Sequence, residues 1–207
     1  MIFGAGDIAL AAVEIFESNG VVVFGILDDR KEMEGKEFGN VAVISGSSDP
    51  SYISLVGKKC EAFIASDETA LRKNLVKSLT KDQKAMPVNA IHPASSISPH
   101  SFVGHGNFVD RGVLIGAGAE IGNHCLIHSG AIIGHSARIS DFVQIGQGAN
   151  IGQGVAVGEG SFVGSGVHIV SGITVGKNSR IGAGSVVVEN VNAGTTVFGN
   201  PAKKVQV

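Results

Sequence analysis

Residues 127–151 read IHSGAIIGHSARISDFVQIGQGANI, and an aliphatic residue returns at every sixth position of this stretch. The same spacing holds without a slip from Ile97 to Val187. A fixed short period is typical of a solenoid, and hexapeptides are the repeat of parallel β-helices. An ordinary sheet would alternate with a period of about two instead. The stretch therefore predicts a parallel β-helix. The repeated aliphatic positions are Ile97, Val103, Val109, Ile115, Ile121, Ile127, Ile133, Ile139, Ile145, Ile151, Val157, Val163, Ile169, Val175, Ile181 and Val187.

Small residues and glycines flank the repeated positions. A small or β-branched residue such as Ala131 precedes most of them by two positions, and a glycine such as Gly134 usually follows directly. We expect these glycines at the corners of a triangular coil, where a positive φ angle is cheap only for glycine. Three hexapeptides would make one coil, with roughly 4.8 Å between coils. Because no insertion breaks the register, any active site must use the faces of this prism or a neighbouring subunit.

Composition limits the partners that the chain can be expected to have. Hydrophobic residues make up 43% of the 207 residues, but aromatic residues only 5%, so the core should be aliphatic. The net charge of −2 gives no reason to expect nucleic acid or an anionic membrane as a partner. No apolar run approaches the roughly 18 residues of a membrane span, and no secretion signal is recognisable. The two cysteines, Cys60 and Cys125, are compatible with a reducing, cytoplasmic location.

Glycine content divides the chain into two domains. Only eight of the 30 glycines precede residue 85, so we predict an α/β domain over residues 1–85 and the solenoid over residues 86–207. Alternating strands and helices in the first domain imply a parallel sheet that binds ligands at the carboxyl ends of its strands. The continuous apolar run Val21–Leu27 is typical of a buried parallel strand. The other expected strands are 2–3, 41–44, 62–65 and 88–91. The expected helices are 8–18 and a second one that ends near Leu79, with Ser66 or Asp67 as its N-cap.

A glycine-rich loop follows the first expected strand. Residues 4–9 read GAGDIA and match G-x-G-x-x-A, which lets a backbone approach phosphate at a helix N-terminus. Asp28 and Asp29 follow a little over twenty residues later, where an acidic side chain can bind ribose hydroxyls. Two features argue against a complete NAD site. Asp7 would repel phosphate, and the domain is too short for two mononucleotide-binding halves. The alternative reading of the loop is a purely structural tight turn.

The hexapeptide run and the ending VFGNPAK at residues 197–203 together resemble the left-handed β-helix acyltransferases. The glycine loop, LDD at 27–29, FIAS at 63–66, IHP at 91–93 and SIS at 96–98 narrow the resemblance. With these features the chain resembles bacterial sugar acetyltransferases of the sialic acid O-acetyltransferase (NeuD/PglD-like) family. The resemblance implies a Rossmann-like first domain that holds a nucleotide sugar. It also implies a left-handed parallel β-helix, a homotrimer, and acetyl-CoA bound in a groove between neighbouring prisms.

The resemblance places the catalytic histidine at His135, within AIIGHS at residues 131–136. His135 lies two positions after a repeated aliphatic residue, so its side chain should project outward. A neutral imidazole can accept a proton from an attacking amine or hydroxyl near neutral pH. The nucleophile would then attack the thioester directly, and a backbone N–H near Gln153 or Gly154 could stabilise the oxyanion.

The sequence departs from the family's pattern at three positions. Ser136 replaces the acidic residue that usually follows the catalytic histidine, Ile8 replaces a histidine of the glycine loop, and Gln144 replaces a second histidine. Asp141, or an acidic residue of a neighbouring chain, could orient His135 in place of the missing acid. His128 matches a position where the family often has a polar residue close to the acceptor.

The remaining histidines are expected to have structural or solvated roles. We expect His105, His124 and His168 at the solvated surface, and His92 and His100 to be structural. A zinc site of this kind needs three nitrogen ligands at roughly 2.0–2.1 Å from the metal. Only His92 and His128 are separated by a multiple of one coil, and they would lie roughly 10 Å apart. We therefore expect no metal site.

The predicted function is that of an acetyl-CoA-dependent N-acetyltransferase acting on a nucleotide-linked amino sugar. Two alternatives stay open, which are a sugar O-acetyltransferase of the sialic-acid type and a catalytically weak binding or scaffold trimer. The missing acid after the catalytic histidine favours an amine as nucleophile over a hydroxyl. The predicted catalytic residue is His135, supported by Ser136, Asp141 and His128. The predicted substrate contacts are Gly6, Asp7, Ile8, Asp28, Asp29, Ser66 and Asp67, and the predicted acetyl-CoA contacts are Gln144, Gln153, Ser165 and Ala183.

Overall fold

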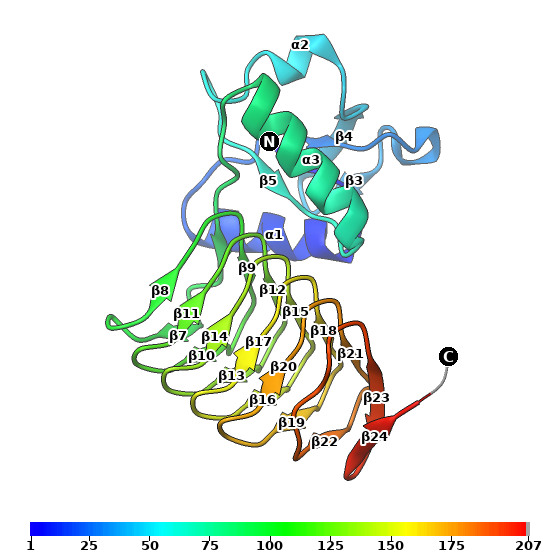
Figure 1. The fold of residues 1–207 in the computed structure, drawn as a ribbon. Coiled ribbons are helices and arrows are strands. Elements are labelled where there is room, and N and C mark those ends of the chain that lie inside the picture. Colours follow the sequence, from blue (N-terminus) through cyan, green and yellow to red (C-terminus); the bar gives the residue numbers. More distant parts are fainter. Residues whose placement is uncertain (206–207) are drawn as a thin grey trace. The chain divides into compact units, whose positions relative to one another are not determined.

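The computed structural model describes residues 1–205, and the chain divides into two compact units, Met1–Pro93 and Ala94–Val207 (Figure 1). The first unit alternates strands and helices. Its strands are β1 (Ile2–Phe3), β2 (Ile26–Leu27), β3 (Glu37–Phe38), β4 (Val41–Ser45), β5 (Phe63–Ile64) and β6 (Ala90–Ile91). Its helices are α1 (Asp7–Ser18), η1 (Lys31–Met33), α2 (Pro50–Ile53) and α3 (Thr69–Asp82).

The sheet of the first unit has the order β3-β4-β2-β1-β5, and its strands are parallel except for β3. Alternation along the strands gives each face its own apolar layer. On one face, the rings of Phe16 in α1 and Phe63 in β5 meet edge to face at 5.6 Å. On the other face, Phe3 and Leu27 share a buried cluster with Leu79 of α3. Helices therefore cover both faces, which leaves the strand ends open for ligands.

The prediction of one long strand over Val21–Leu27 is wrong. Only Ile26 and Leu27 are strand residues, whereas Val22 is 91% exposed. A strand exists only where a neighbour offers backbone groups to pair with. On this side of β2 the neighbour is β1, which pairs through Ile2 and Phe3 alone. The apolar run therefore extends past the end of its partner, and composition gave no sign of that end.

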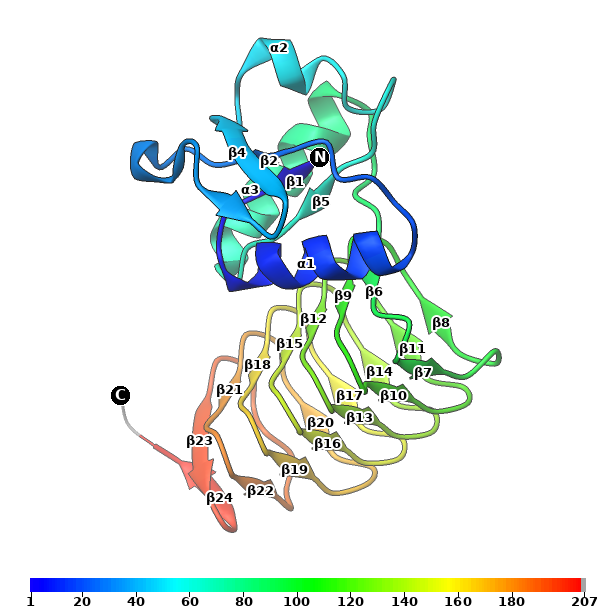
Figure 2. The ribbon, with the colours of Figure 1, turned by 180° about the vertical axis from the view of Figure 1, so that it is seen from behind.

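The second unit is a left-handed parallel β-helix of two-residue strands, β7 to β22, followed by β23 and β24 (Figure 2). Three parallel sheets form the faces of the prism, in the orders β22-β19-β16-β13-β10-β7, β20-β17-β14-β11-β8 and β23-β21-β18-β15-β12-β9. We call them the first, second and third face, and the chain visits them in that order. The strands are Ser96–Ile97, Phe102–Val103, Phe108–Val109, Leu114–Ile115, Glu120–Ile121, Leu126–Ile127, Ile132–Ile133, Arg138–Ile139, Gln144–Ile145, Asn150–Ile151, Ala156–Val157, Phe162–Val163, His168–Ile169, Thr174–Val175, Arg180–Ile181, Val186–Val187, Thr196–Gly199 and Ala202–Lys204.

Each repeated aliphatic residue is the second residue of its strand, and its side chain enters the core. Stacked partners are 18 residues apart, as Ile115, Ile133 and Ile151 show on the first face. All three are at most 3% exposed. The six-residue period therefore specified the fold of this unit and its register.

Two sets of glycines form the turns, and they are required for different reasons. Glycines three positions after the aliphatic residue have the positive φ angles, for example Gly148 at 63° and Gly154 at 65°. Glycines directly after the aliphatic residue do not, so the expectation of positive φ at these positions is wrong. A Cβ atom added at Gly146 would lie 2.5 Å from the backbone nitrogen of Ser165, on the next coil. This second set is glycine because coils approach too closely for any side chain.

One predicted surface histidine is buried. His124 is 5% exposed, adopts a positive φ angle of 57° and packs its ring 5.0 Å from the ring of Phe142. It lies at a corner whose equivalent positions are usually glycine, so the backbone folds the ring against its neighbour. His105 and His168 are exposed, as predicted, and Cys125 is a fully buried thiol.

Candidate functional site

A cavity of about 630 Å³ opens at the carboxyl ends of the parallel strands in the first unit. The segments that follow β1, β2, β4 and β5 all contribute to its walls, as expected for an open α/β sheet. Helices α1 and α3 both begin at this cavity. All seven predicted substrate contacts line it, together with Arg30, which the sequence reading missed. The lining includes Gly4, Ala5, Gly6, Asp7, Ile8, Asp28, Asp29, Arg30, Ser47, Ser66, Asp67 and Glu68.

The two glycines of the loop differ in what they contribute. Gly4 has a φ angle of 100°, and a Cβ atom there would lie 2.7 Å from the carbonyl oxygen of Ala65. The fold therefore requires glycine at position 4. Gly6 has an extended φ angle of −150°, and a Cβ atom there would meet nothing within 4 Å. Because the fold tolerates a side chain at position 6, the open space beside Gly6 belongs to the cavity.

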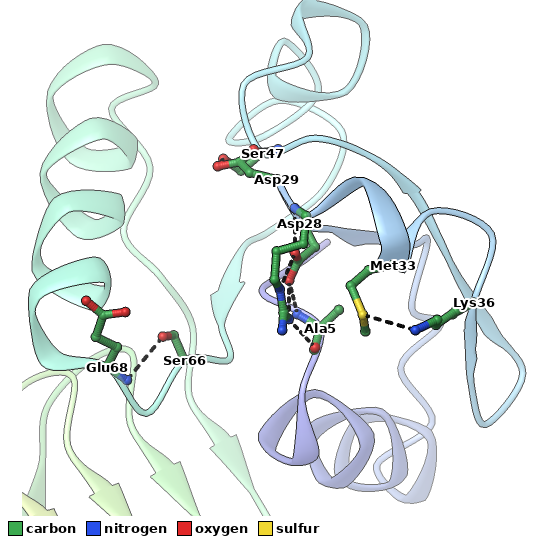
Figure 3. Close-up of polar contacts among 9 residues, drawn as sticks. Ala5, Asp28, Asp29, Met33, Lys36, Ser47, Ser66 and Glu68 are labelled. Atoms are coloured by element: carbon green, nitrogen blue, oxygen red, sulfur yellow. Dashed lines mark hydrogen bonds and ion pairs between the residues drawn. The ribbon is translucent and has the colours of Figure 1, made fainter.

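The carboxylate of Asp28 is already engaged in hydrogen bonds within the protein. Its two carboxylate oxygens accept hydrogen bonds from the backbone N–H of Ala5 at 2.7 Å and from Nε and Nη2 of Arg30, both at 2.9 Å (Figure 3). Arg30 Nη2 also donates to the carbonyl oxygen of Ala5 at 2.5 Å. Burial raises the pKa of Asp28, but these hydrogen bonds outweigh burial and hold the pKa below its ordinary value. Asp28 therefore ties the glycine loop to β2 and fixes Arg30 at the cavity.

Asp29 is engaged in a similar way, whereas three other carboxylates are not. The oxygens of Asp29 accept hydrogen bonds from the backbone N–H of Ser47 at 2.7 Å and from its hydroxyl at 2.8 Å. Within residues 1–205, the side chains of Asp7, Asp67 and Glu68 form no such bond. Asp7 is the first residue of α1, whereas Asp67 and Glu68 directly precede α3. They are the carboxylates that a ligand could reach without displacing a protein contact.

His135 lies on the solenoid, at the corner between β13 of the first face and β14 of the second. It is exposed, as its position in the repeat predicted. The backbone N–H of Ala117, one coil earlier, donates to its Nδ1 at 3.0 Å. Gly116 leaves room for this contact, because a Cβ atom there would lie 2.9 Å from Nδ1. Since an amide can only donate, Nδ1 holds a lone pair and the neutral ring carries its proton on Nε2.

The predicted supporting residues lie at other corners of the same prism, apart from Ser136. Asp141 follows β14 and accepts hydrogen bonds from the backbone and side-chain nitrogens of Asn123, at 2.8 and 3.2 Å. His128 follows β12 on the third face, and its Nε2 lies 3.1 Å from Nε2 of Gln144. Ser136, which replaces the expected acid, has a positive φ angle of 55°. Within one chain, the corners therefore separate Asp141 and His128 from His135.

Three of the four predicted acetyl-CoA contacts occupy two corners, whereas Gln144 lies within β15 on the third face. Gln153 lies directly above His135, whereas Ser165 and Ala183 lie between the third face and the first, and all three are exposed. Gly154 N–H donates to the carbonyl oxygen of His135 at 2.9 Å, so it is already used. Gln153 N–H has no acceptor among the described residues. Of the two candidate oxyanion donors, only Gln153 has an N–H group free to serve.

Residues 1–205 contain neither a cluster of metal-ligating side chains nor a membrane-spanning helix. No three His, Cys, Asp or Glu residues lie close enough together to hold a metal ion. No helix in this part of the chain is long and apolar enough to cross a membrane.

Comparison with known proteins places this fold among acetyltransferases. Residues 85–178 match the family described as the GMPPB C-terminal domain. No curated protein sequence matches the chain. A mutant of perosamine N-acetyltransferase from Caulobacter crescentus, solved with CoA and GDP-perosamine, is 29% identical with a TM-score of 0.90. The alignment covers 100% of this chain and 96% of that protein.

Two further solved structures align over nearly the whole chain. The acetyltransferase domain of PglB from Neisseria gonorrhoeae FA1090, in complex with acetyl coenzyme A, is 26% identical with a TM-score of 0.90, covering 99% of this chain and 97% of that one. WeeI from Acinetobacter baumannii AYE is 21% identical with a TM-score of 0.77, covering 99% and 98%, and supports the fold alone.

Proposed function

We propose that this chain, which is similar over its whole length to bacterial sugar acetyltransferases of the hexapeptide-repeat type, acetylates the amino group of a nucleotide-linked sugar, with acetyl-CoA as donor. The observation that carries the proposal is the cavity of the first unit. It combines two helix N-termini with a fixed guanidinium, which is the chemistry that binds phosphate. The similar enzyme from Caulobacter crescentus, solved with GDP-perosamine, supports a nucleotide sugar as the ligand.

In the proposed complex, Arg30 and the free N–H groups at the start of α1 bind the diphosphate. Gly6 contributes open space, so that the backbone can approach the phosphates closely. Asp28 acts as a positioning residue, because its hydrogen bonds hold Arg30 and Ala5 in place. This differs from the role predicted from sequence, in which Asp28 itself binds ribose hydroxyls.

His135 is the proposed general base. The amine attacks the thioester carbonyl, the C–S bond breaks, and the amine proton passes to the imidazole while the CoA thiolate leaves. Accepting that proton at Nε2 requires the tautomer with its own proton on Nδ1. The ring therefore gives up its contact with the Ala117 N–H before proton transfer. The N–H of Gln153 supplies a donor for the developing oxyanion.

We also propose that the active enzyme is a homotrimer in the cytoplasm. Gln153 shares a corner with His135, but Ser165 and Ala183 lie at another corner of the same prism. A groove that uses both sets of residues needs corners from two chains. Sedimentation analysis would test this, because a monomer that retains full activity contradicts it.

The direct test of function is an acetyl-transfer assay. The protein is incubated with acetyl-CoA and a panel of UDP-, GDP- and dTDP-linked amino sugars while free thiol is followed. Thiol release that depends on an amino sugar is the expected result. Release with a hydroxy sugar such as sialic acid instead would identify an O-acetyltransferase. If no acceptor in the panel supports thiol release, the enzymatic proposal fails.

A further inference from the structure

Ser136 carries a side chain at a turn position where the neighbouring coils have glycine. It is the third residue of its turn, which the Ala137 N–H closes by donating to the carbonyl oxygen of Gly134 at 3.2 Å. A positive φ angle is needed at this place, and the equivalent residues one coil before and after are Gly118 at 70° and Gly154 at 65°. Ser136 adopts 55°. The chain therefore keeps backbone strain at this corner that a glycine would remove.

The strained residue directly follows His135, and both side chains lie against the same turn of the preceding coil. A Cβ atom added at Gly116 would lie 2.9 Å from Nδ1 of His135, and one added at Gly118 would lie 3.2 Å from Oγ of Ser136. Only Ala117 separates these two glycines, and its N–H contacts the imidazole. The hydroxyl of Ser136 therefore lies beside the proposed catalytic base.

The Ser136 hydroxyl is available to a ligand. The side chain is exposed, and its Oγ forms no hydrogen bond within residues 1–205. The backbone N–H of Ser136 is already used, because it donates to the carbonyl oxygen of Ala117 at 3.0 Å. The Gly154 N–H makes the same contact with His135 one coil later. The turn thus needs the backbone of residue 136 but not its side chain, and strain kept without a structural use indicates a function.

We propose that Ser136 Oγ accepts a hydrogen bond from the attacking amine and thereby favours amino over hydroxy acceptors. The inference rests on the proposed function, because it takes His135 as the base. A neutral primary amine carries two N–H bonds. As its lone pair forms the C–N bond and the C–S bond breaks, one proton passes to the imidazole, and the second N–H stays on nitrogen and donates to Oγ. A hydroxyl acceptor gives its single proton to the base and has none left for Oγ.

The test compares Ser136→Ala with the wild type in the thiol-release assay. The acceptors are a nucleotide-linked primary amino sugar and its N-methyl derivative, which is still a nucleophile but carries one N–H. With the primary amine we expect the variant to lose about five- to tenfold in kcat/KM, as for one missing hydrogen bond. With the N-methyl derivative, whose only proton goes to the base, we expect no change.

The matched control uses a second strained residue, Asn178. It is exposed and has a φ angle of 54° at the same place in the repeat, but at the corner between the second and third faces. Ser136→Gly and Asn178→Gly should each raise the melting temperature by about 2–4 °C, because each removes left-handed strain. Only Ser136→Gly should lower kcat/KM for the primary amine. A purely structural role for Ser136 would not combine higher stability with lower activity.

The remaining outcomes contradict one proposal or the other. If Ser136→Ala keeps the full rate with the primary amine, the hydroxyl has no part in the reaction and the inference is wrong. If the variant loses the same factor with both acceptors, the hydroxyl acts on the turn or on His135 and not on the second N–H, which also overturns the inference. If the wild type releases no thiol with any amino sugar, the proposed function fails and the inference fails with it.

Discussion

The solenoid unit Ala94–Val207 and the α/β unit Met1–Pro93 position their polar side chains by different means. In the solenoid, the register alone decides, since His135 and the Ala117 N–H that contacts it are one coil of 18 residues apart. In the α/β unit, groups with no regular spacing meet where strands end, such as Ala5 and Asp28, or Asp29 and Ser47. In a periodic scaffold, the position of a residue in the repeat predicts where its side chain points. At the edge of a sheet, a site forms only when segments far apart in the sequence come together in the fold.

Replacing His135 should have the largest effect. We expect His135→Ala to lower turnover about 10²–10⁴-fold, because general-base catalysis contributes that much. The matched control is His105→Ala, since His105 is also exposed and also lies two positions after a repeated aliphatic residue, but at another corner. Thiol release at saturating substrates measures both. Equal losses in the two variants would show that the corner of His135 has no special role.

The two glycine sets of the solenoid should respond differently to one added methyl group. Gly146→Ala places a Cβ atom against the Ser165 backbone, so we expect a loss of about 3 kcal/mol in the free energy of unfolding. Gly148→Ala meets no atom within 4 Å and suffers only from its positive φ angle, at about 1–2 kcal/mol. Urea denaturation measures both values. A larger loss for Gly148→Ala would contradict the close-approach explanation.

In the glycine loop of the α/β unit, substitutions at the two glycines should separate an effect on stability from an effect on ligand binding. Gly6→Ala should leave the free energy of unfolding within about 0.5 kcal/mol, because the fold leaves room for its Cβ atom. We expect the same variant to weaken nucleotide binding about tenfold, since the methyl group enters the space beside the phosphates. Gly4→Ala is the comparison variant, and it should lose stability through its clash with Ala65. Unchanged affinity in Gly6→Ala would leave the loop as a structural turn.

The smallest expected effect is a pH dependence of stability through Asp28. The pKa of Asp28 is lowered in the folded chain, so the ionised carboxylate stabilises the fold above its ordinary pKa. This contribution is lost as the pH falls through the lowered folded-state value. Between about pH 5 and pH 2, the melting temperature of the wild type should therefore fall more than that of Asp28→Asn. Parallel melting curves would mean that the bonds to Ala5 and Arg30 do not contribute.

Prediction from the sequence was accurate where the pattern is periodic. It was less accurate where contacts between distant segments determine the structure. It predicted every repeated strand of the solenoid and the exposure of His135. It also identified three of the segments that line the cavity, because strand ends are marked by Gly4–Ala9, Asp28 and Ser66, but it did not identify the segment with Ser47. It overestimated the strand at Val21–Leu27, since the length of a strand depends on the neighbour with which it pairs. It missed Arg30, whose importance appears only when Asp28 and Ala5 fix its guanidinium.

The sequence by itself determined the β-helix, its register and the outward direction of His135, because a fixed period leaves the chain one way to stack its aliphatic positions. Only the tertiary structure decided which polar groups are free to act. In the sequence, Asp28 and Asp29 resemble a ligand-binding pair. In the structure, however, both carboxylates accept hydrogen bonds from the protein itself. The Asp7 side chain, by contrast, is exposed and forms no hydrogen bond within residues 1–205. Hydrogen-bond partners are set by contacts between distant segments, and no local pattern encodes them.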